Sequence, residues 1–466
     1  MSGARQGAGI KEEEAPMYIS EEIAEIVTAV EDLPPSVSDA TRRCILDAVS
    51  AAVTGQGTPG GKAARDGAVA AWGSGSIPIW LSSARSTEMG AAFANSAAVT
   101  MLDIDDGHRA AAGHPGASIV PAVLAAVHED PALAPRAVTA VAIGYEVGLR
   151  IAASRDVRTL DTVITGRWCG QGVAAAIGWL KRLSPRVIAE AVAAAGSVAP
   201  IMAVAEFTEV GNHVKEAIPH ATANGLASLH LAQAGLIAPL DILDDARIFS
   251  RSTLLDGLGE RWMIESCYFK PYSCCRWIHA PIDGLLKIMA DENLTFQDIT
   301  KIHIDTFGKA MTLNNQKAPK SLEAGQFSIP FCLGVLATRG PEALVPMTDP
   351  DLLNDPKILA FASLVEVAFD SEMDSYFPSA VPSRISVSSR GATYSETVMA
   401  PLGEPSNPMG WDALFGKFHA LASHHLASHQ EAALRRALDD MRLGDLAPLL
   451  SELARPAMEP ERVLVR

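Results

Sequence analysis

Acidic and histidine side chains are concentrated in one short stretch in the first quarter of the chain. The stretch reads MLDIDDGHRAAAGHPG and places Asp103, Asp105 and Asp106 close to His108 and His114. Apolar, alanine-rich runs flank it, so we predict a loop between two buried helices. Carboxylates in such a loop can orient an imidazole and fix its tautomer for acid–base chemistry. The alternative is helix capping, because these residue types also end helices without a chemical role.

Two further segments carry cations that suit an anionic ligand. Lys215 stands in NHVKEAIPH, before an Ala/Gly-rich run, and the alternative is a lysine whose stem lies along the surface. The segment FKPYSCCRWIH gathers Lys270, Cys275, Arg276 and His279. An arginine there can bind a carboxylate through two parallel hydrogen bonds. The alternative for this segment is a strand at a domain junction with structural thiols.

Tyr145 lies among small residues in the segment GYEVG of a predicted helix. Such a tyrosine can donate or accept a proton if nearby cations lower its pKa. A core tyrosine with a single hydrogen bond is the alternative.

The hydrophobic pattern predicts how these residues are positioned. Alanine-rich helical runs dominate from Ile19 to about Leu243, whereas residues 301–307, 383–387 and 394–399 alternate like strands. Residues 327–338 and 359–367 are predicted helices between those strands. We expect a mainly α fold, with a large discontinuous all-helical domain and a smaller α+β domain. The expected division is a disordered arm (1–18), helical domain (19–265), α+β domain (266–400) and returning helical part (401–466).

Charge and composition limit the partners. The chain has 54 acidic and 38 basic residues and a net charge of -16, which argues against nucleic acid and anionic membranes. Its 48% hydrophobic content is typical of globular proteins. The six cysteines show no paired spacing, so we expect a reduced, cytoplasmic setting.

Signatures of several common chemistries are absent from the sequence. It contains no GxxxxGK[ST] phosphate loop, no GxGxxG after a predicted strand, no GxSxG and no HExxH. One cluster has metal-ligand residue types: His419, His424, His425 and His429, of which His425 and His429 are spaced i,i+4 on a predicted helix. No carboxylate or cysteine accompanies it, so a solvated helix face is the favoured interpretation. We therefore expect neither a metal nor a cofactor.

Six segments, taken in order over about residues 20–420, resemble the MmgE/PrpD (2-methylcitrate dehydratase) family. They are EDLPPSVSDATRRCILDAVSAAVTG, the acidic–histidine loop, AIGYEVGLRIA, FKPYSCCRWIHAPID, GQFSIPFCLGVLATRG and PLGEPSNPM…FGKF. The resemblance implies two domains with a cleft between them, a homodimer, and cofactor-free chemistry on small polycarboxylates. Family members include 2-methylcitrate dehydratases, cis-aconitate decarboxylases and iminodisuccinate epimerase. By position, Asp103, His114, Lys215 and Lys270 match site residues of the family.

Three positions depart from the family pattern. Val163 stands where dehydratase- and decarboxylase-like members carry the histidine of a His-Pro-Thr-Gly run. Cys275 replaces a histidine of the decarboxylases, and Ile218 replaces one found in many members. Elimination requires an acid for the leaving hydroxide, whereas epimerisation requires a base on one face of the carbon and a proton donor on the other. A site that keeps its cations and loses histidines fits epimerisation better.

The sequence thus predicts an isomerase: an epimerase of an amino- or imino-dicarboxylate such as iminodisuccinate. The predicted catalytic residues are Tyr145, His114, Lys215, Lys270 and the orienting Asp103. The predicted substrate-binding residues are Arg276, His108, Cys275 and His279. A lyase, either a 2-methylcitrate-type dehydratase or a cis-aconitate-type decarboxylase, is the first alternative. A non-catalytic polycarboxylate-binding protein is the second.

Overall fold

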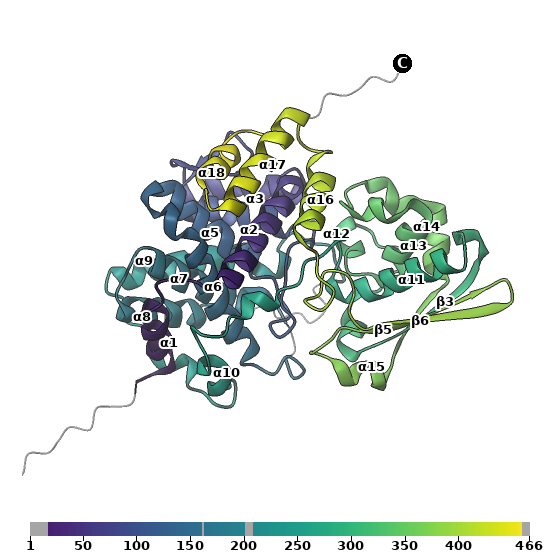
Figure 1. Ribbon diagram of the computed structural model, residues 1–466, viewed down its shortest axis with the longest axis horizontal. Helices are drawn as coiled ribbons and strands as arrows, with labels where there is room; N and C mark the ends of the chain where they lie inside the picture. Colours follow the sequence, from purple (N-terminus) through teal and green to yellow (C-terminus); the bar gives the residue numbers. More distant parts are fainter. Residues whose placement is uncertain (1–16, 161–162, 201–207, 459–466) are drawn as a thin grey trace, which may run out of the picture.

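The fold is mainly helical, with one small sheet at an end of the molecule. The computed structural model describes residues 17–160, 163–200 and 208–458, so most of the predicted N-terminal arm lies outside the described residues. Figure 1 shows a large group of helices on one side and the sheet with its own helices on the other. The expected mainly α fold with a smaller α+β part is therefore confirmed.

The larger group, which we call the helical body, combines two separate stretches of the chain. Its first stretch contains α1 (Ile19–Thr28), α2 (Pro35–Gly55), α3 (Pro59–Trp72), α4 (Glu88–Thr100), α5 (Gly116–Glu129), α6 (Ala137–Ala153), α7 (Cys169–Leu180), α8 (Pro185–Ser197), α9 (Ile218–Gln233) and α10 (Arg251–Leu255), with a short hairpin of β1 (Ile77–Pro78) and β2 (Arg85–Ser86). Its second stretch contains α16 (Trp411–Ala422), α17 (Ser428–Leu443) and α18 (Ala447–Leu453), and α16 packs against α2. His424 and His425 lie in the turn between α16 and α17, so His425 does not share a helix with His429.

The central element of the helical body is α5. Every residue from Gly116 to Val127 is buried, as expected for a helix that is apolar or small on all sides. Its neighbours α6 and α7 meet at two glycines, where a Cβ on Gly172 would lie 2.6 Å from the carbonyl oxygen of Gly144. Ile119 in the first turn of α5 lies against both glycines, so this close packing helps to position the start of α5.

The α+β part is built on a four-stranded sheet of order β4-β3-β5-β6. It contains α11 (His279–Asp291), β3 (Ile299–Thr306), α12 (Leu322–Gly325), α13 (Ile329–Arg339), α14 (Pro356–Ser363), β4 (Val365–Phe369), α15 (Ser371–Tyr376), β5 (Ser383–Ser389) and β6 (Ala392–Val398). Strands β3 and β4 are parallel, the other two pairs are antiparallel, and α11 packs against β5 and β6.

One predicted helix in this part is wrong. The helix expected over residues 359–367 ends at Ser363, and β4 begins at Val365. Val365 and Val367 align with Ile302 and Ile304 of β3, so β-branched side chains join the edge of a sheet. A short apolar run fits both the 3.6-residue period of a helix and the two-residue period of a strand. Here pairing with β3 determined the structure.

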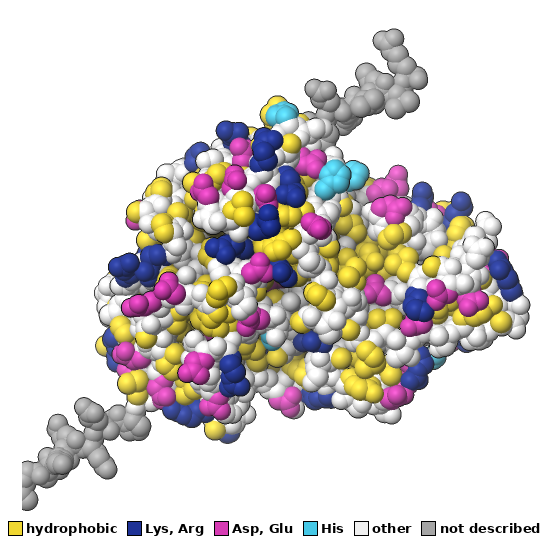
Figure 2. All heavy atoms as spheres, in the orientation of Figure 1, with side chains coloured by type: hydrophobic (Ala, Val, Ile, Leu, Met, Phe, Trp, Pro, Cys, Tyr) yellow, Lys and Arg dark blue, Asp and Glu magenta, His cyan; other side chains and the backbone are white. Residues whose placement is uncertain are grey.

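Among the described residues, no helix combines the length and apolarity that crossing a membrane requires. On the face drawn in Figure 2, basic and acidic side chains are interspersed and form no continuous basic patch.

A buried ion pair connects the two stretches of the helical body. Lys417 on α16 donates to Asp47 Oδ1 on α2 at 2.6 Å and to the carbonyl oxygen of Ile104 at 2.5 Å. The Lys417 side chain is 1% exposed and that of Asp47 is fully buried. The pair therefore also holds the loop that carries the acidic and histidine residues.

Removing one partner of this pair should be strongly destabilising. We expect Lys417→Met to lower the free energy of unfolding by about 3–5 kcal/mol in urea denaturation, because Asp47 is left as an unpaired buried charge. Adding Asp47→Asn to that variant should restore much of the loss. The matched control is Lys287→Met, which breaks an exposed pair with Asp291 and should leave stability unchanged. Equal effects of the two single variants would contradict the interpretation.

Candidate active site

A cavity lies where the helical body meets the α+β part, and it has two lobes. The lobes share His114, Thr208, Glu216 and Phe327. We call the smaller one the acid–base lobe, because its wall also contains Asp103, Lys215 and Glu323. The larger one, which we call the wide lobe, has a volume of about 80 Å³ and extends over Ala112, Val163, Trp277, Lys309 and Leu313.

His114 lies at the junction of the lobes because the start of α5 holds it there. Asp106 Oδ1 accepts a hydrogen bond from the backbone N–H of Gly116, the first residue of α5, at 3.1 Å. A Cβ on Gly116 would lie 2.3 Å from that oxygen, so only glycine allows this approach. The backbone N–H of His114 donates to Thr165 Oγ1 at 3.0 Å, which fixes the residue from the opposite side.

Carboxylates surround both nitrogens of the His114 ring. Nδ1 lies 3.2 Å from the carbonyl oxygen of Asp106 and 3.2 Å from Asp105 Oδ2. Nε2 lies 3.4 Å from Asp103 Oδ1 and 3.9 Å from Glu216 Oε1. The ring can therefore donate from both nitrogens when it is charged.

The two histidines of this loop have opposite protonation states. Burial and Lys270 disfavour a charged His114, but Asp105 and Asp103 outweigh them and raise its pKa to about 9. Burial and the neighbouring Arg109 lower the pKa of His108 to about 4. At neutral pH, His114 is thus an imidazolium and His108 a neutral imidazole.

Lys270 stands behind Asp103 and is fully buried. Its Nζ donates to Asp103 Oδ1 at 3.1 Å. Burial disfavours the ammonium, but Asp103 and Asp105 raise its pKa above the ordinary value. Asp103 itself has φ = 51°, a left-handed conformation that is unfavourable for a residue with a side chain. Asp103 therefore neutralises the positive charge of Lys270. Lys270 lines neither lobe.

Lys215 has a different environment from Lys270. Its Nζ donates to Gln326 Oε1 at 2.5 Å, lies 5.4 Å from the centre of the Phe327 ring, and forms no ion pair with a described residue. Burial lowers its pKa, although Asp103 and Glu323 oppose the shift. A buried ammonium without a carboxylate partner is well suited to bind an anion that enters the lobe.

The backbone that carries Lys215 is strained. Lys215, Glu216 and Ala217 have φ values of 47°, 55° and 57°, three successive left-handed residues that all carry a Cβ. Each such residue costs about 1–2 kcal/mol relative to the right-handed conformation. The neighbouring Gly166 accommodates this turn, since a Cβ there would lie 2.6 Å from the Glu216 carbonyl oxygen. Strain of this kind is concentrated at functional sites, where it fixes side chains in position.

Glu216 is a residue of the cavity that the sequence analysis missed. It faces both lobes, and its Oε2 accepts from the backbone N–H and Oγ1 of Thr165 at 2.9 and 2.6 Å. Its position next to Lys215 was the available signal, but the left-handed turn that aims both side chains at one cavity cannot be predicted from composition.

Arg276 lines the wide lobe but is already neutralised. Its Nε and Nη2 donate to Glu404 Oε1, each at 2.9 Å, and it also donates to the carbonyl oxygens of Leu402 and Pro401. Glu404 is fully buried, and its second oxygen lies 3.2 Å from Arg109. The guanidinium thus joins the 401–404 segment to the cavity wall, and little of its hydrogen-bonding capacity faces a ligand.

The other predicted site residues are spread between the cavity and the core. Cys275 lines the wide lobe, and burial raises the pKa of its thiol. His279 is buried, donates from Nε2 to the carbonyl oxygen of Cys274, and lines neither lobe. His108 lines neither lobe either.

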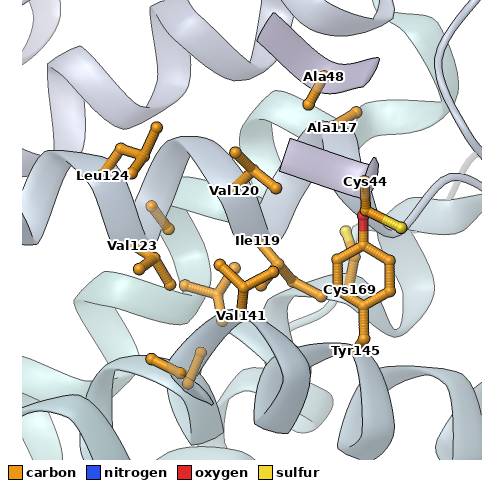
Figure 3. Packing of buried hydrophobic residues seen from close by; sticks show 14 of the residues in the cluster. Cys44, Ala48, Ala117, Ile119, Val120, Val123, Leu124, Val141, Tyr145 and Cys169 are labelled. Carbon is orange, nitrogen blue, oxygen red and sulfur yellow. The ribbon is translucent and has the colours of Figure 1, made fainter. Parts of the chain in front are cut away.

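Tyr145 donates to Asp106 Oδ2 at 2.9 Å, and Figure 3 shows its ring in the core with the hydroxyl close to Cys44. Burial and Asp106 raise the pKa of Tyr145, so it stays a neutral donor that supports Asp106.

The three positions that depart from the family pattern lie in two different places. Val163 and Cys275 both line the wide lobe, whereas Ile218 is buried in the core at the start of α9. The structure therefore brings Asp103, His114 and Lys270 into contact and places Lys215 in the same lobe as Asp103 and His114. The chemical roles of these residues stay predictions.

Two groups of buried side chains have metal-ligand types within 4.8 Å of one another in the described part of the chain. One is Asp103, Asp105 and His114, and the other is Cys44, Asp106 and Cys267. In the first group, Lys270 and the charged ring of His114 already neutralise the carboxylates and would repel a metal cation. In the second, Asp106 accepts from Gly116 and Tyr145.

The opposite titration of the two loop histidines can be measured. We expect His114 to stay protonated until the pH approaches about 9, and His108 to stay neutral at every pH above about 4, in the side-chain ¹⁵N spectra of histidine-labelled protein. Because the folded-state pKa of His114 is raised, its contribution to stability is complete below the unfolded value near 6.5 and is lost as the pH rises through about 9. His114→Asn should remove that loss. A neutral His114 at pH 7 would contradict the charge arrangement.

Comparison with known proteins agrees with the two-part architecture of the chain. Residues 21–257 match the MmgE/PrpD N-terminal domain, and residues 272–443 match the MmgE/PrpD C-terminal domain. Two curated relatives named cis-aconitate decarboxylase, one from Aspergillus terreus (strain NIH 2624 / FGSC A1156) and one from Aspergillus terreus, are each 24% identical to the chain. Each alignment covers 93% of this chain and 94% of the relative. Since the two domain matches cover most of the sequence, the protein belongs to the MmgE/PrpD family.

Proposed function

We propose that this protein is a lyase that decarboxylates a small, unsaturated polycarboxylate. The observation that carries the proposal is the imidazolium of His114 in the same lobe as the buried Lys215, whose Nζ forms no ion pair with a described residue. One group can supply a proton, and the other can hold a carboxylate. The names of the two relatives favour a lyase over the epimerase expected from the sequence.

The reaction needs little beyond these two groups. Lys215 binds the carboxylate next to the reacting carbon. The bond to a second carboxylate breaks, CO₂ leaves, and the electron pair spreads into the unsaturated system that ends at Lys215. The Nε2–H of His114 then protonates the carbanion, and a proton from solvent recharges the ring. A fixed cation in a site that excludes water stabilises the developing charge more strongly than water does.

The protonation state of His114 is why decarboxylation is favoured. Elimination and epimerisation both start with removal of a proton from carbon, which needs a base, whereas decarboxylation generates the carbanion by itself and needs only an acid. Asp103 and Asp105 keep His114 in the acid form across neutral pH. Asp103 and Asp105 are therefore positioning residues, which act through the protonated ring of His114.

Epimerisation is the second candidate, and Glu216 is the observation that favours it. Its carboxylate faces the same cavity and lies 3.9 Å from His114 Nε2, so the cavity holds one candidate base and one acid. In this alternative, Glu216 removes the α-proton of an amino- or imino-dicarboxylate and keeps it, while His114 delivers its own proton to the other face; exchange with solvent then resets both groups.

Incubation of the purified protein with cis-aconitate in D₂O tests the proposal. We expect release of CO₂ and incorporation of one carbon-bound deuterium per turnover, followed by ¹H NMR. Activity should fall as the pH rises through about 9, because the proton donor is lost. Deuterium exchange of amino- or hydroxydicarboxylates without CO₂ would favour epimerisation, and a new C=C absorbance from a hydroxy acid would favour dehydration. Either result, without decarboxylation, would overturn the proposal.

Variants of His114 and Lys215 test the roles of proton donor and carboxylate-binding group in the same assay. His114→Ala should lower kcat about 100- to 10,000-fold, the usual contribution of a general acid. Lys215→Met should raise KM by about tenfold or more, the effect of losing one charge-assisted hydrogen bond. His128→Ala at the opposite end of α5 is the matched control and should keep wild-type kinetics. Full activity of His114→Ala would contradict the assigned donor.

A further inference from the structure

The wide lobe contains a cation that the proposed reaction does not use. Lys309 lies in the short 3-10 helix Gly308–Thr312, directly after β3 and Phe307, and lines the lobe together with Thr312. Its Nζ donates to the carbonyl oxygen of Leu160 at 2.7 Å. Among the residues that the structure describes, Lys309 forms no ion pair and donates this one hydrogen bond.

The remaining charges that face this lobe do not compete for Lys309. Arg276 is held by Glu404, Glu216 accepts from Thr165, and His114 is enclosed by Asp103 and Asp105. The cavity as a whole therefore has two lysines without carboxylate partners among the described residues, Lys215 in the acid–base lobe and Lys309 in the wide lobe.

Between these two lysines the cavity wall is largely apolar. Val163, Trp277, Leu313 and Phe327 line the wide lobe. Val163 and Cys275 stand at positions where the family resemblance predicts histidines, so two polar groups are missing from this wall. An apolar wall gains from contact with carbon, and Lys309 is the cation of this lobe that has no carboxylate partner among the described residues.

The apolar wall is also rigid. Trp277 lies edge-on to Phe307 with ring centres 5.8 Å apart, and Phe307 stacks on Phe377 at 4.9 Å. Phe307 and Phe377 are buried, and Val163 packs against the same cluster. The shape of the lobe is thus set before a ligand enters, which favours selection by chain length.

We infer that the wide lobe binds the part of the substrate remote from the reacting carbon, an apolar chain that ends in a carboxylate anchored by Lys309. The inference rests on the proposed function only in that Lys215 binds the first carboxylate. It assigns Lys309 as a specificity-determining residue and assigns the substrate to polycarboxylates in which an apolar spacer separates the carboxylate bound by Lys309 from the reacting end.

Binding of unreactive saturated α,ω-dicarboxylates tests the inference without any turnover. Succinate, glutarate, adipate and pimelate are titrated into the wild type and followed by calorimetry. We expect affinity to increase with chain length, by up to about fourfold for each buried methylene, until the chain spans both lysines. Lys309→Met, which keeps the apolar stem, should weaken the best dicarboxylate about tenfold or more and leave the monocarboxylate of equal length unchanged.

Controls separate this inference from the proposed function. Lys317→Met is the matched control, because Lys317 also donates only to a backbone carbonyl, that of Ser363, and lies outside the cavity wall. Lys309→Arg should retain the chain-length preference. The melting temperature of each variant is measured first, and only variants that melt at the same temperature as the wild type are compared. The inference is overturned if succinate binds best, if no dicarboxylate binds, or if Lys309→Met weakens mono- and dicarboxylates equally. A protein that shows the expected preference but releases no CO₂ from cis-aconitate refutes the decarboxylase and leaves the assignment of Lys309 standing.

Discussion

The structure depends on the balance of a buried group of charges around the 103–106 loop. Asp47, Asp103, Asp105 and Asp106 are buried there together with His114, Lys270 and Lys417. Isolated buried charges are too unfavourable to persist, so each must be compensated by its neighbours. Burial and the carboxylates of Asp47 and Asp105 raise the pKa of Asp106 to about 7. Lys270, Lys417 and the charged ring of His114 supply the compensating positive charge.

That balance connects the candidate site residues to the scaffold. Lys270 is contributed by the segment that leads into the α+β part, Lys417 by α16, and the acids by α2 and the loop before α5. His114 is therefore charged because of residues that are distant in sequence, and its pKa is a property of the whole assembly. The left-handed residues Asp103 and Lys215–Ala217 are sustained by the same packing, since strain persists only where the surroundings fix the backbone.

The sequence predicts those features that depend on neighbouring residues in the chain, and it does not predict contacts between distant residues. The helical character, the family and the concentration of acids and histidines before α5 were readable, because each depends on contiguous residues. The pairing of Arg276 with Glu404, which are 128 positions apart, leaves no local signal, so a neutralised guanidinium resembled a ligand clamp. Glu216 and Lys309 were missed for the same reason: a strained turn and the end of a strand bring ordinary surface residue types to one cavity. The helix expected over 359–367 failed because its apolar run fits two periods.

The position of Lys417 also bears on how the chain assembles during synthesis. The loop that presents His114 is complete after about a quarter of the sequence, yet Asp47 and the carbonyl of Ile104 wait for an ammonium that is translated some three hundred residues later. Domains generally fold as units, in order, as the chain emerges. Here the entire α+β part is made before the helical body receives Lys417. A nascent chain released before α16 therefore carries Asp47 in its core without the ammonium that pairs with it, and the loop that holds the candidate site residues lacks its contact with Lys417.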